Sequence, residues 1–255
     1  MRASFAGRFL RGASYHLRAI AFLREHPELK RYLAWPILIN VLVGGALYAG
    51  MLYGGWLAVD ALVARLPGWL AFMAVVLHLV LIAGLLVVTG ILVAKFGVIL
   101  GAPWYGKLAE QLEAIRLGPE ALPAPTGGPL SDVGQALGYE LRKLVLTIGL
   151  GLPLLVVNMV PVAGPVISTV GGVALGVTIL CLDFLDPALG RRRLRFRAKL
   201  KTVYRHMPTT GGFGLVSLAL VGMPLVNLLT VPLSVTAATL LYCDEIAEQA
   251  TPARA

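Results

Sequence analysis

Leu29, Lys30 and Arg31 place two cationic side chains at the expected start of a helix. Pro27 lies just upstream, and proline is favoured in the first turn of a helix, where backbone amides have no partner within the helix. Free amides, the positive end of the helix dipole and two cations can together bind an anion. In the alternative interpretation, Lys30 and Arg31 only flank a membrane span as cytoplasmic charges, and Glu28 caps the helix.

A second set of polar groups lies within apolar stretches of the chain. In a transporter, asparagine side chains at membrane depth can line a path and donate hydrogen bonds to an anion without trapping it. In the alternative, they bond to neighbouring helices or to carbonyl groups that prolines leave free. The candidates for lining a path are Asn40, Asn158 and Asn227.

The sequence gives little support to enzymatic chemistry. An enzyme of this kind needs a nucleophile with its base or a cluster of metal ligands, and the histidines are scattered, at positions 16, 26, 78 and 206. We interpret Asp183 and Asp186 as residues that close one helix and cap the next turn, not as a metal site. No Walker-type glycine-rich motif followed by lysine is present. We therefore expect no enzyme activity, no ATP hydrolysis in this chain, no cofactor and no metal.

The composition points to a membrane protein that must position these residues in lipid. Of 255 residues, 58% are hydrophobic and only 14% are charged, and the mean hydropathy is +0.81. A soluble domain needs far more charge to cover its surface. The net charge of +9 comes from basic residues at the edges of apolar runs, which favours anionic lipid as a partner over nucleic acid.

The apolar pattern predicts one all-α membrane domain over residues 1–255. Residues 1–26 should form an interfacial amphipathic helix, with Phe5, Phe9, Ala13, Leu17 and Ile20 at helical spacing. Two spanning helices are predicted, each longer than the roughly 20 residues that a bilayer requires. The predicted elements in order are the spans 32–59 and 66–94, a cytoplasmic helix and loop over 101–143, and a basic cytoplasmic segment over 183–210.

Two further apolar segments, 144–182 and 211–242, each carry an asparagine between prolines. Proline has no amide donor and clashes with the preceding turn of a helix. The apolar leg before each cluster is about 14 residues, or about 21 Å as a helix, short of the roughly 30 Å of hydrocarbon. We predict two hairpins that dip into the membrane and return; ordinary helix pairs making six spans are the alternative. The predicted tip prolines are Pro153, Pro161, Pro224 and Pro232.

The distribution of positive charge predicts the orientation. The first 35 residues carry seven Lys or Arg and residues 183–210 carry eight, but residues 59–69 carry one. By the positive-inside rule, both termini of this multi-pass protein should be cytoplasmic, at the inner (plasma) membrane. The arginine run could gather anions at a pore mouth, or, in the interpretation we favour, bind anionic lipid. It comprises Arg191, Arg192, Arg193, Arg195 and Arg197.

Four stretches together resemble the CysZ sulfate permease family, the bacterial branch of the etoposide-induced-protein superfamily. They are "KRYLAWPILIN", "GAPWYGKLAEQLE", "LDFLDPALGRRRLRFR" and "GFGLVSLALVGMPLVNLLTVPLSVTAATLLY", and the resemblance covers roughly residues 10–245. It implies two full spans, two hemi-penetrating hairpins, assembly as a homo-oligomer, and uptake of sulfate for cysteine synthesis. A non-transporting membrane organiser that binds lipid or protein partners is the alternative function.

The resemblance also implies an anion site before the first span. Members of the family carry a Gly-Leu-Arg-type motif there, which binds an anion through backbone amides and arginine. The matching residues are Glu28, Leu29, Lys30 and Arg31. Arg31 is retained, Lys30 keeps the charge without the forked geometry of arginine, and Glu28 replaces the glycine.

Overall fold

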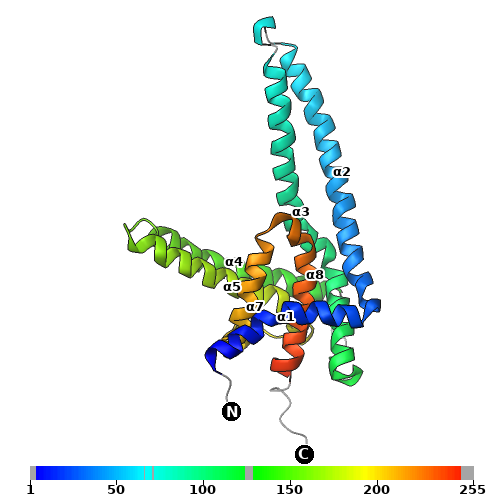
Figure 1. The fold of residues 1–255 in the computed structure, drawn as a ribbon, viewed down its shortest axis with the longest axis vertical. Helices are drawn as coiled ribbons and strands as arrows, with labels where there is room; N and C mark the ends of the chain where they lie inside the picture. The colour runs from blue at the N-terminus through cyan, green and yellow to red at the C-terminus, as the bar shows by residue number, and fades with distance from the viewer. Residues whose placement is uncertain (1–3, 66, 71, 124–128, 248–255) are drawn as a thin grey trace, which may run out of the picture. The chain divides into compact units, whose positions relative to one another are not determined.

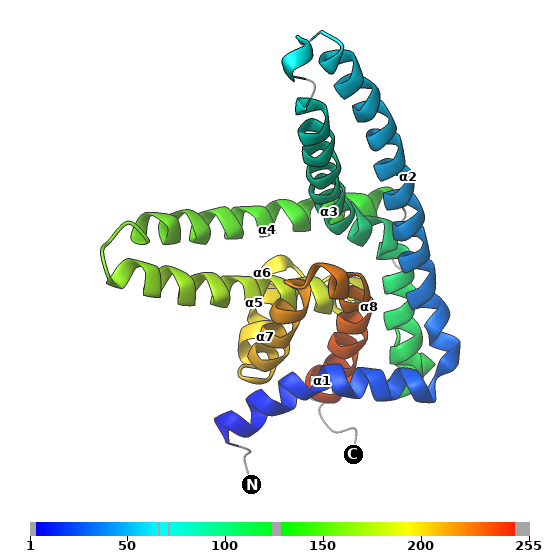
Figure 2. The same ribbon diagram turned by 45° about the horizontal axis from the view of Figure 1, so that its top comes forward.

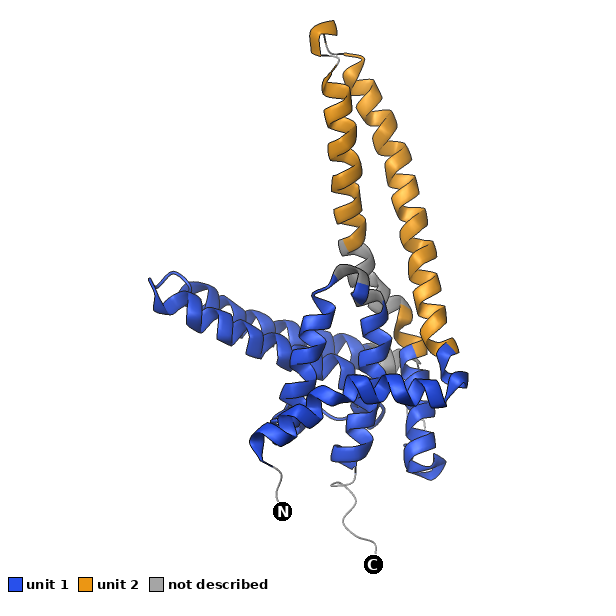
Figure 3. Cartoon of the chain, viewed as in Figure 1, with its two compact units in different colours: residues 1–30, 105–255 blue, residues 31–104 orange. Residues whose placement is uncertain are grey.

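The structure is a computed structural model in which every regular element of the described residues is helical (Figure 1). It describes residues 4–65, 67–70, 72–123 and 129–247, with the side chains at 91–100, 129–133, 224–225 and 227–228 outside that description. The prediction of an all-α protein is therefore confirmed over these residues. The chain divides into two compact units, unit 1 (residues 1–30 and 105–255) and unit 2 (residues 31–104) (Figure 3).

Unit 2 consists mainly of two long helices joined by a short turn. Helix α2 spans Lys30–Val63, and α3 spans Met73–Leu117, of which the part up to residue 104 belongs to unit 2. The turn between them contains the short helix η2, Gly68–Leu70. Helix α3 begins later than the predicted position 66, because Pro67 and Gly68 hold this stretch of chain in the turn.

Three helices of the described residues are long and apolar enough to cross a membrane. They are Pro27–Val63, Met73–Gly90 and Ala163–Arg191. The first two correspond to the two predicted spans. The third is α5, Ala163–Arg191, whose 29 residues exceed the length of a bilayer crossing. The helix that precedes it, Pro129–Val157, also has 29 residues, so neither leg of this pair is as short as the apolar pattern predicted.

Unit 1 is built around the packing of α1, Phe5–Glu25, against α7, Thr209–Val221, and α8, Pro224–Leu241. The face of α1 that packs inward carries small and aromatic side chains. Its buried residues are Gly12, Tyr15, His16, Ala19, Phe22 and Leu23. Of the apolar face expected to meet the membrane, Leu17 is 71% exposed and Phe5 is also exposed, whereas Phe9 and Ala13 are half-buried beside α7.

Helices α1 and α7 cross with their backbones in contact, because each has a glycine at the crossing. A Cβ atom on Gly12 would lie 1.8 Å from the carbonyl oxygen of Thr209, and one on Gly212 would lie 2.0 Å from that of Phe9. Neither distance is possible for real atoms, so only glycine permits this approach. The close approach lets the inward face of α1 reach α7 and α8.

Helices α4, Pro129–Val157, and α5 lie side by side and are joined by residues 158–162 (Figure 2). Helix α4 begins well before the predicted position 144, so the predicted helix and loop over 101–143 comprises the end of α3, the short helix η3, Pro119–Ala121, and the start of α4. The basic segment contains α6, Phe196–Arg205. After α8, the chain forms η4, Tyr242–Ala247.

The prolines do not all lie at the turns. Pro161 lies in the turn between α4 and α5, and Pro224 is the first residue of α8. Pro153 and Pro232, in contrast, lie inside α4 and α8, so the prediction that these two mark hairpin tips is wrong. Apolar helices tolerate interior prolines where neighbouring elements or local adjustment satisfy the freed carbonyl.

Candidate functional site

The three residues of the candidate anion site lie where η1, Pro27–Leu29, meets the start of α2. Leu29 is buried, whereas Lys30 and Arg31 are exposed. The tight turn uses two of the amides that an anion would need. The amide of Leu29 donates to the carbonyl of His26 at 3.2 Å, and that of Lys30 donates to the carbonyl of Pro27.

The side chains around this turn are partly engaged with one another. Arg31 donates to the Tyr32 hydroxyl at 2.9 Å, and its guanidinium carbon lies 4.8 Å from the centre of the Tyr32 ring. Glu28 Oε1 lies 3.0 Å from His26 Nδ1. The Glu28 carboxylate therefore interacts with His26 and places a negative charge two residues before Lys30 in the chain.

The candidate path-lining asparagines lie on three different elements. Asn40 is buried on α2, on the same helical face as the buried Pro36 and Gly44. Asn158 lies in the turn after α4, where its Oδ1 accepts a 2.7 Å hydrogen bond from Ser168. That bond closes the turn, as the neighbour-bonding alternative predicts. Asn227 belongs to α8, but its side chain lies outside the described residues.

The arginine run is split by the structure. Arg191 and Arg192 both bind the carboxylate of Glu113, which is only 1% exposed; the contact of Arg192 measures 2.9 Å. Arg191 also donates to the carbonyl of Gly106 at 3.0 Å, and Arg192 lies over the ring of Tyr242. These two arginines therefore fasten α5 to the last turns of α3 and cannot form an open pore mouth.

The partner of Glu113 is a finding that sequence reasoning missed. Helical spacing alone would place Arg116, three residues further along α3, next to Glu113. In the structure Arg116 instead donates to Asp244 at 2.8 Å. The true partners, Arg191 and Arg192, are 78 and 79 residues away along the chain. The local sequence gives no signal for the burial of Glu113, because Lys107, Glu110 and Arg116 lie in the same stretch.

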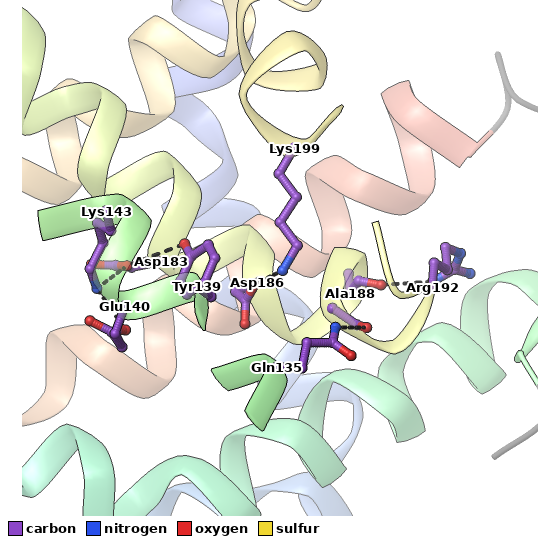
Figure 4. A network of polar contacts seen from close by, with 10 residues as sticks. Gln135, Tyr139, Glu140, Lys143, Asp183, Asp186, Ala188, Arg192 and Lys199 are labelled. Carbon is purple, nitrogen blue, oxygen red and sulfur yellow. Dashed lines mark hydrogen bonds and ion pairs between the residues drawn. The ribbon is translucent and has the colours of Figure 1, made fainter. Parts of the chain in front are cut away.

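A polar network joins α4, α5 and α6 (Figure 4). Lys199 is only 3% exposed; it binds Asp186 and lies 4.4 Å from the centre of the Tyr139 ring. Lys143 binds Asp183 at 2.8 Å. The two aspartates, expected to close and cap helices, therefore form ion pairs with lysines of the neighbouring helices. Burial, and then the charge of Asp183, raises the pKa of Tyr139.

The two ends of unit 1 are fastened to each other. Arg11 of α1 donates to Glu245 at 3.0 Å, and Asp244 accepts from Tyr15 at 3.4 Å as well as from Arg116. Burial, and then the charge of Asp244, raises the pKa of Tyr15.

His16 lies in the core between α1, α7 and α8. Its Nε2 is 3.1 Å from the Ser217 hydroxyl and 3.4 Å from that of Ser234, and its ring stacks on Phe213. Burial lowers the pKa of His16 to about 4, so the ring is neutral at physiological pH. This histidine is therefore a part of the packing of α1.

Within the described ranges, no group of three His, Cys, Asp or Glu side chains is placed to hold a metal ion. Cys181 and Cys243 are both buried free thiols.

Comparison with known proteins gives one consistent result. Residues 15–232 match the family described as "Sulfate transporter CysZ/Etoposide-induced protein 2.4". A sulfate transporter CysZ of Pseudomonas aeruginosa (strain LESB58) is 28% identical over 227 residues, 88% of this chain and 91% of the relative. Proteins of the same name from Vibrio cholerae serotype O1 and Salmonella paratyphi A are 25% and 27% identical, over 89% and 86% of this chain and 91% and 86% of the relatives.

These relatives are named as transporters and not as enzymes, and the matches extend over most of each chain. The family match includes the start of α2, the α4–α5 pair and most of the α7–α8 pair. The chain belongs to the CysZ/etoposide-induced protein 2.4 family of membrane proteins.

Proposed function

We propose that this protein carries sulfate, or a closely related oxyanion, across the inner (plasma) membrane without hydrolysing ATP. The observation that carries the proposal is the match over about nine-tenths of the chain to proteins named sulfate transporters. Helices long and apolar enough to cross a membrane support it. The exposed cations Lys30 and Arg31 at the start of α2 supply the positive charge that attracts the anion.

In this proposal, the anion first binds at residues 29–31 and then passes polar groups that replace part of its water shell. Leu29 is buried directly before the two exposed cations. The candidate groups along the path are Asn40 and Asn227, whereas Asn158 serves mainly to close its turn through Ser168. The protein attracts the anion, replaces part of its water shell and lets it pass, and none of these steps requires a covalent bond.

We further infer that α4–α5 and α7–α8 enter the membrane from the basic side and return, and that copies of the chain assemble into a homo-oligomer. Helix α7 has 13 residues, about 20 Å, which is too short for a full crossing. The turn between α4 and α5 exposes apolar side chains, Met159 at 82% and Val162 at 90%. Lipid or another copy of the chain would cover them. Both termini are then cytoplasmic.

The depth of the hairpins is tested by labelling single cysteines in sealed vesicles. A cysteine at Met159 should resist a membrane-impermeant thiol reagent from both sides, because it lies within the hydrocarbon. Arg65→Cys in the turn of unit 2 should react from the side opposite the termini. Reaction of Met159→Cys from the same side as Arg65→Cys would show that α4 and α5 are full spans.

Transport is tested by uptake of labelled sulfate into liposomes that contain the purified protein. Uptake should exceed that of empty liposomes, and Lys30→Gln with Arg31→Gln should lower it by about tenfold or more, since two charges near the anion are lost. A matched control, Arg8→Gln with Arg24→Gln, removes two exposed cations of α1. It should retain most of the uptake.

A second variant should change uptake in the opposite direction. Glu28→Gln removes the negative charge beside Lys30 and Arg31 and should lower the sulfate concentration for half-maximal uptake by several-fold. Uptake at the empty-liposome level for the intact protein would contradict sulfate transport. Parallel assays with selenate and thiosulfate then distinguish another oxyanion from a protein that organises the membrane without transport.

A further inference from the structure

Helix α6 has two chemically different faces. Lys199 and Val203, four residues apart, are buried against the rest of unit 1. The opposite face carries exposed cations at helical spacing with one aromatic side chain among them. This outward face comprises Arg197, Lys201, Tyr204 and Arg205, and Tyr204 is 53% exposed.

The outward face differs from the arginines that precede it. Arg191 and Arg192 are bound to the buried carboxylate of Glu113. In the part of the chain that the structure describes, Arg197, Lys201 and Arg205 form no ion pair with a carboxylate. Their positive charge is therefore available to a ligand outside the chain.

The orientation of α6 is fixed by the polar network of Figure 4. Lys199 lies on the inward face, where it binds Asp186 of α5 and lies over the ring of Tyr139 of α4. A buried lysine that lost its partner would have a high energetic cost. Rotation of α6 about its axis is therefore opposed, and Arg197, Lys201 and Arg205 continue to face outward.

From its position along the chain, we expect α6 at the boundary between hydrocarbon and water. It follows α5, a candidate span that ends at Arg191, and precedes the apolar helix α7, which begins at Thr209. Cations at this boundary are attracted to anionic headgroups, and tyrosine is enriched there. We propose that the outward face of α6 binds the phosphate headgroups of anionic phospholipids in the leaflet next to it.

The proposal does not depend on sulfate transport, and it is specific about residues. The headgroup ligand is a phosphodiester monoanion, which a cluster of three cations complements in charge. Tyr204 lies among these cations and carries no charge, so a labelled cysteine can replace it without loss of the charge cluster. The arginines bound to Glu113 take no part in this contact.

A fluorescent label on a cysteine at position 204 tests the contact locally in the full-length protein. The native cysteines are both buried, so Tyr204→Cys is the site that a thiol-reactive fluorophore modifies. The protein is reconstituted into phosphatidylcholine vesicles that contain a small fraction of nitroxide-labelled phosphatidylglycerol or nitroxide-labelled phosphatidylcholine. The ratio of quenching by the phosphatidylglycerol label to quenching by the phosphatidylcholine label should indicate a local enrichment of phosphatidylglycerol of about fivefold or more. A factor of about five corresponds to the attraction of one cation to an anionic surface. High salt should reduce this enrichment.

Two variants separate charge from structure. In the labelled protein, Arg197→Gln, Lys201→Gln and Arg205→Gln together should bring the quenching ratio close to one. Arg197→Lys with Arg205→Lys, which keeps the charge, should preserve it. A label at Arg65→Cys in unit 2 serves as a control, because its quenching ratio should not respond to substitutions in α6.

Three outcomes would overturn the proposal. Equal quenching by the two labelled lipids would show no preference for the anionic headgroup. An unchanged ratio in the triple glutamine variant would show that other residues attract the lipid. Absence of quenching by either lipid would place α6 in bulk water, where its outward face would suit a soluble acidic partner.

Discussion

Unit 1 and unit 2 are stabilised by different kinds of interaction. In unit 1, distant segments are fastened by buried ion pairs and by direct backbone contact, as at Glu113 and at the crossing of Gly12 with Gly212. In unit 2, the helices have few buried side chains, and only 6% of the most apolar stretch of Met73–Gly90 is buried. Inside a membrane, lipid contacts the apolar side chains of such helices, so these side chains need no protein partner to keep them from water.

The described side chains of the two helices of unit 2 meet in the half nearer the turn that joins them. Trp56 lies with its ring centre 4.0 Å from that of His78, and His78 Nε2 lies 3.3 Å from Asp60 Oδ1. Gly55 faces Leu81 closely. The comparison teaches that unit 1 depends on specific partners within the chain, whereas unit 2 depends mainly on its surroundings. Four measurements test this contrast.

The largest effect is expected at Glu113. Glu113→Ala leaves Arg191 and Arg192 facing each other without their carboxylate, which should destabilise the protein by about 3–5 kcal/mol. Thermal unfolding in detergent measures the loss. The control is Glu140→Ala, since Glu140 pairs with Lys143 but is largely exposed, and it should cost less than about 1 kcal/mol. Similar losses for the two variants would contradict a special role for the buried carboxylate.

The glycine crossing should give the next largest effect. Gly212→Ala forces α1 and α7 apart, because its Cβ would overlap the carbonyl of Phe9, and should cost about 1–3 kcal/mol. Gly50→Ala in unit 2 is the matched control, since no atom lies within 4 Å of the added Cβ. It should be neutral or slightly stabilising. Melting temperatures of both variants decide whether the contrast between the units holds.

His16 should make unit 1 sensitive to mild acid. Burial lowers its pKa from 6.5 to about 4, so between these values the unfolded chain binds more protons than the folded protein. Stability should therefore fall as the pH falls through this window, by about 2 kcal/mol at pH 5. The measurement is the melting temperature of the wild type and of His16→Gln at pH 7 and pH 5. An equal change with pH in both proteins would assign the acid sensitivity to other groups.

The smallest effect is expected for the polar pair of unit 2. Asp60 is more than half exposed, so Asp60→Asn should change the free energy of unfolding by less than about 1 kcal/mol. The same thermal assay checks it. A loss comparable to that of Glu113→Ala would break the comparison, because it would show that unit 2 also depends on a specific internal partner.

Local hydropathy predicted much of the helical architecture. The runs that became α2 and α3 are apolar over more than a bilayer thickness, and this property needs no knowledge of partners. The turn after α4 was also predictable, from Asn158 and Pro161 together. Prolines alone were a weaker guide, because Pro153 and Pro232 are accommodated inside helices. Whether a proline ends a helix depends on neighbours that the local sequence does not specify.

The candidate site was predictable in position but not in detail. Pro27 indicated a helix start, and η1 and α2 do meet there. The sequence could not show that the amides of Leu29 and Lys30 are used within the turn. Likewise, the arginine run looked uniform, and only long-range packing distinguishes Arg191, bound to Glu113, from Arg197 on the outward face of α6.

The fastening of α1 to η4 has a consequence for how the protein is made. Arg11 and its partner Glu245 are 234 residues apart, and synthesis at about 5–20 residues per second separates their appearance by about 10–50 seconds. Helix α1 therefore exists before the helices that cover its inward face. Its exposed apolar residues, such as Leu17, allow α1 to bind the bilayer surface while the rest of the chain is translated. The folding of unit 1 is then completed late, when α7, α8 and η4 have been synthesised and pack against α1.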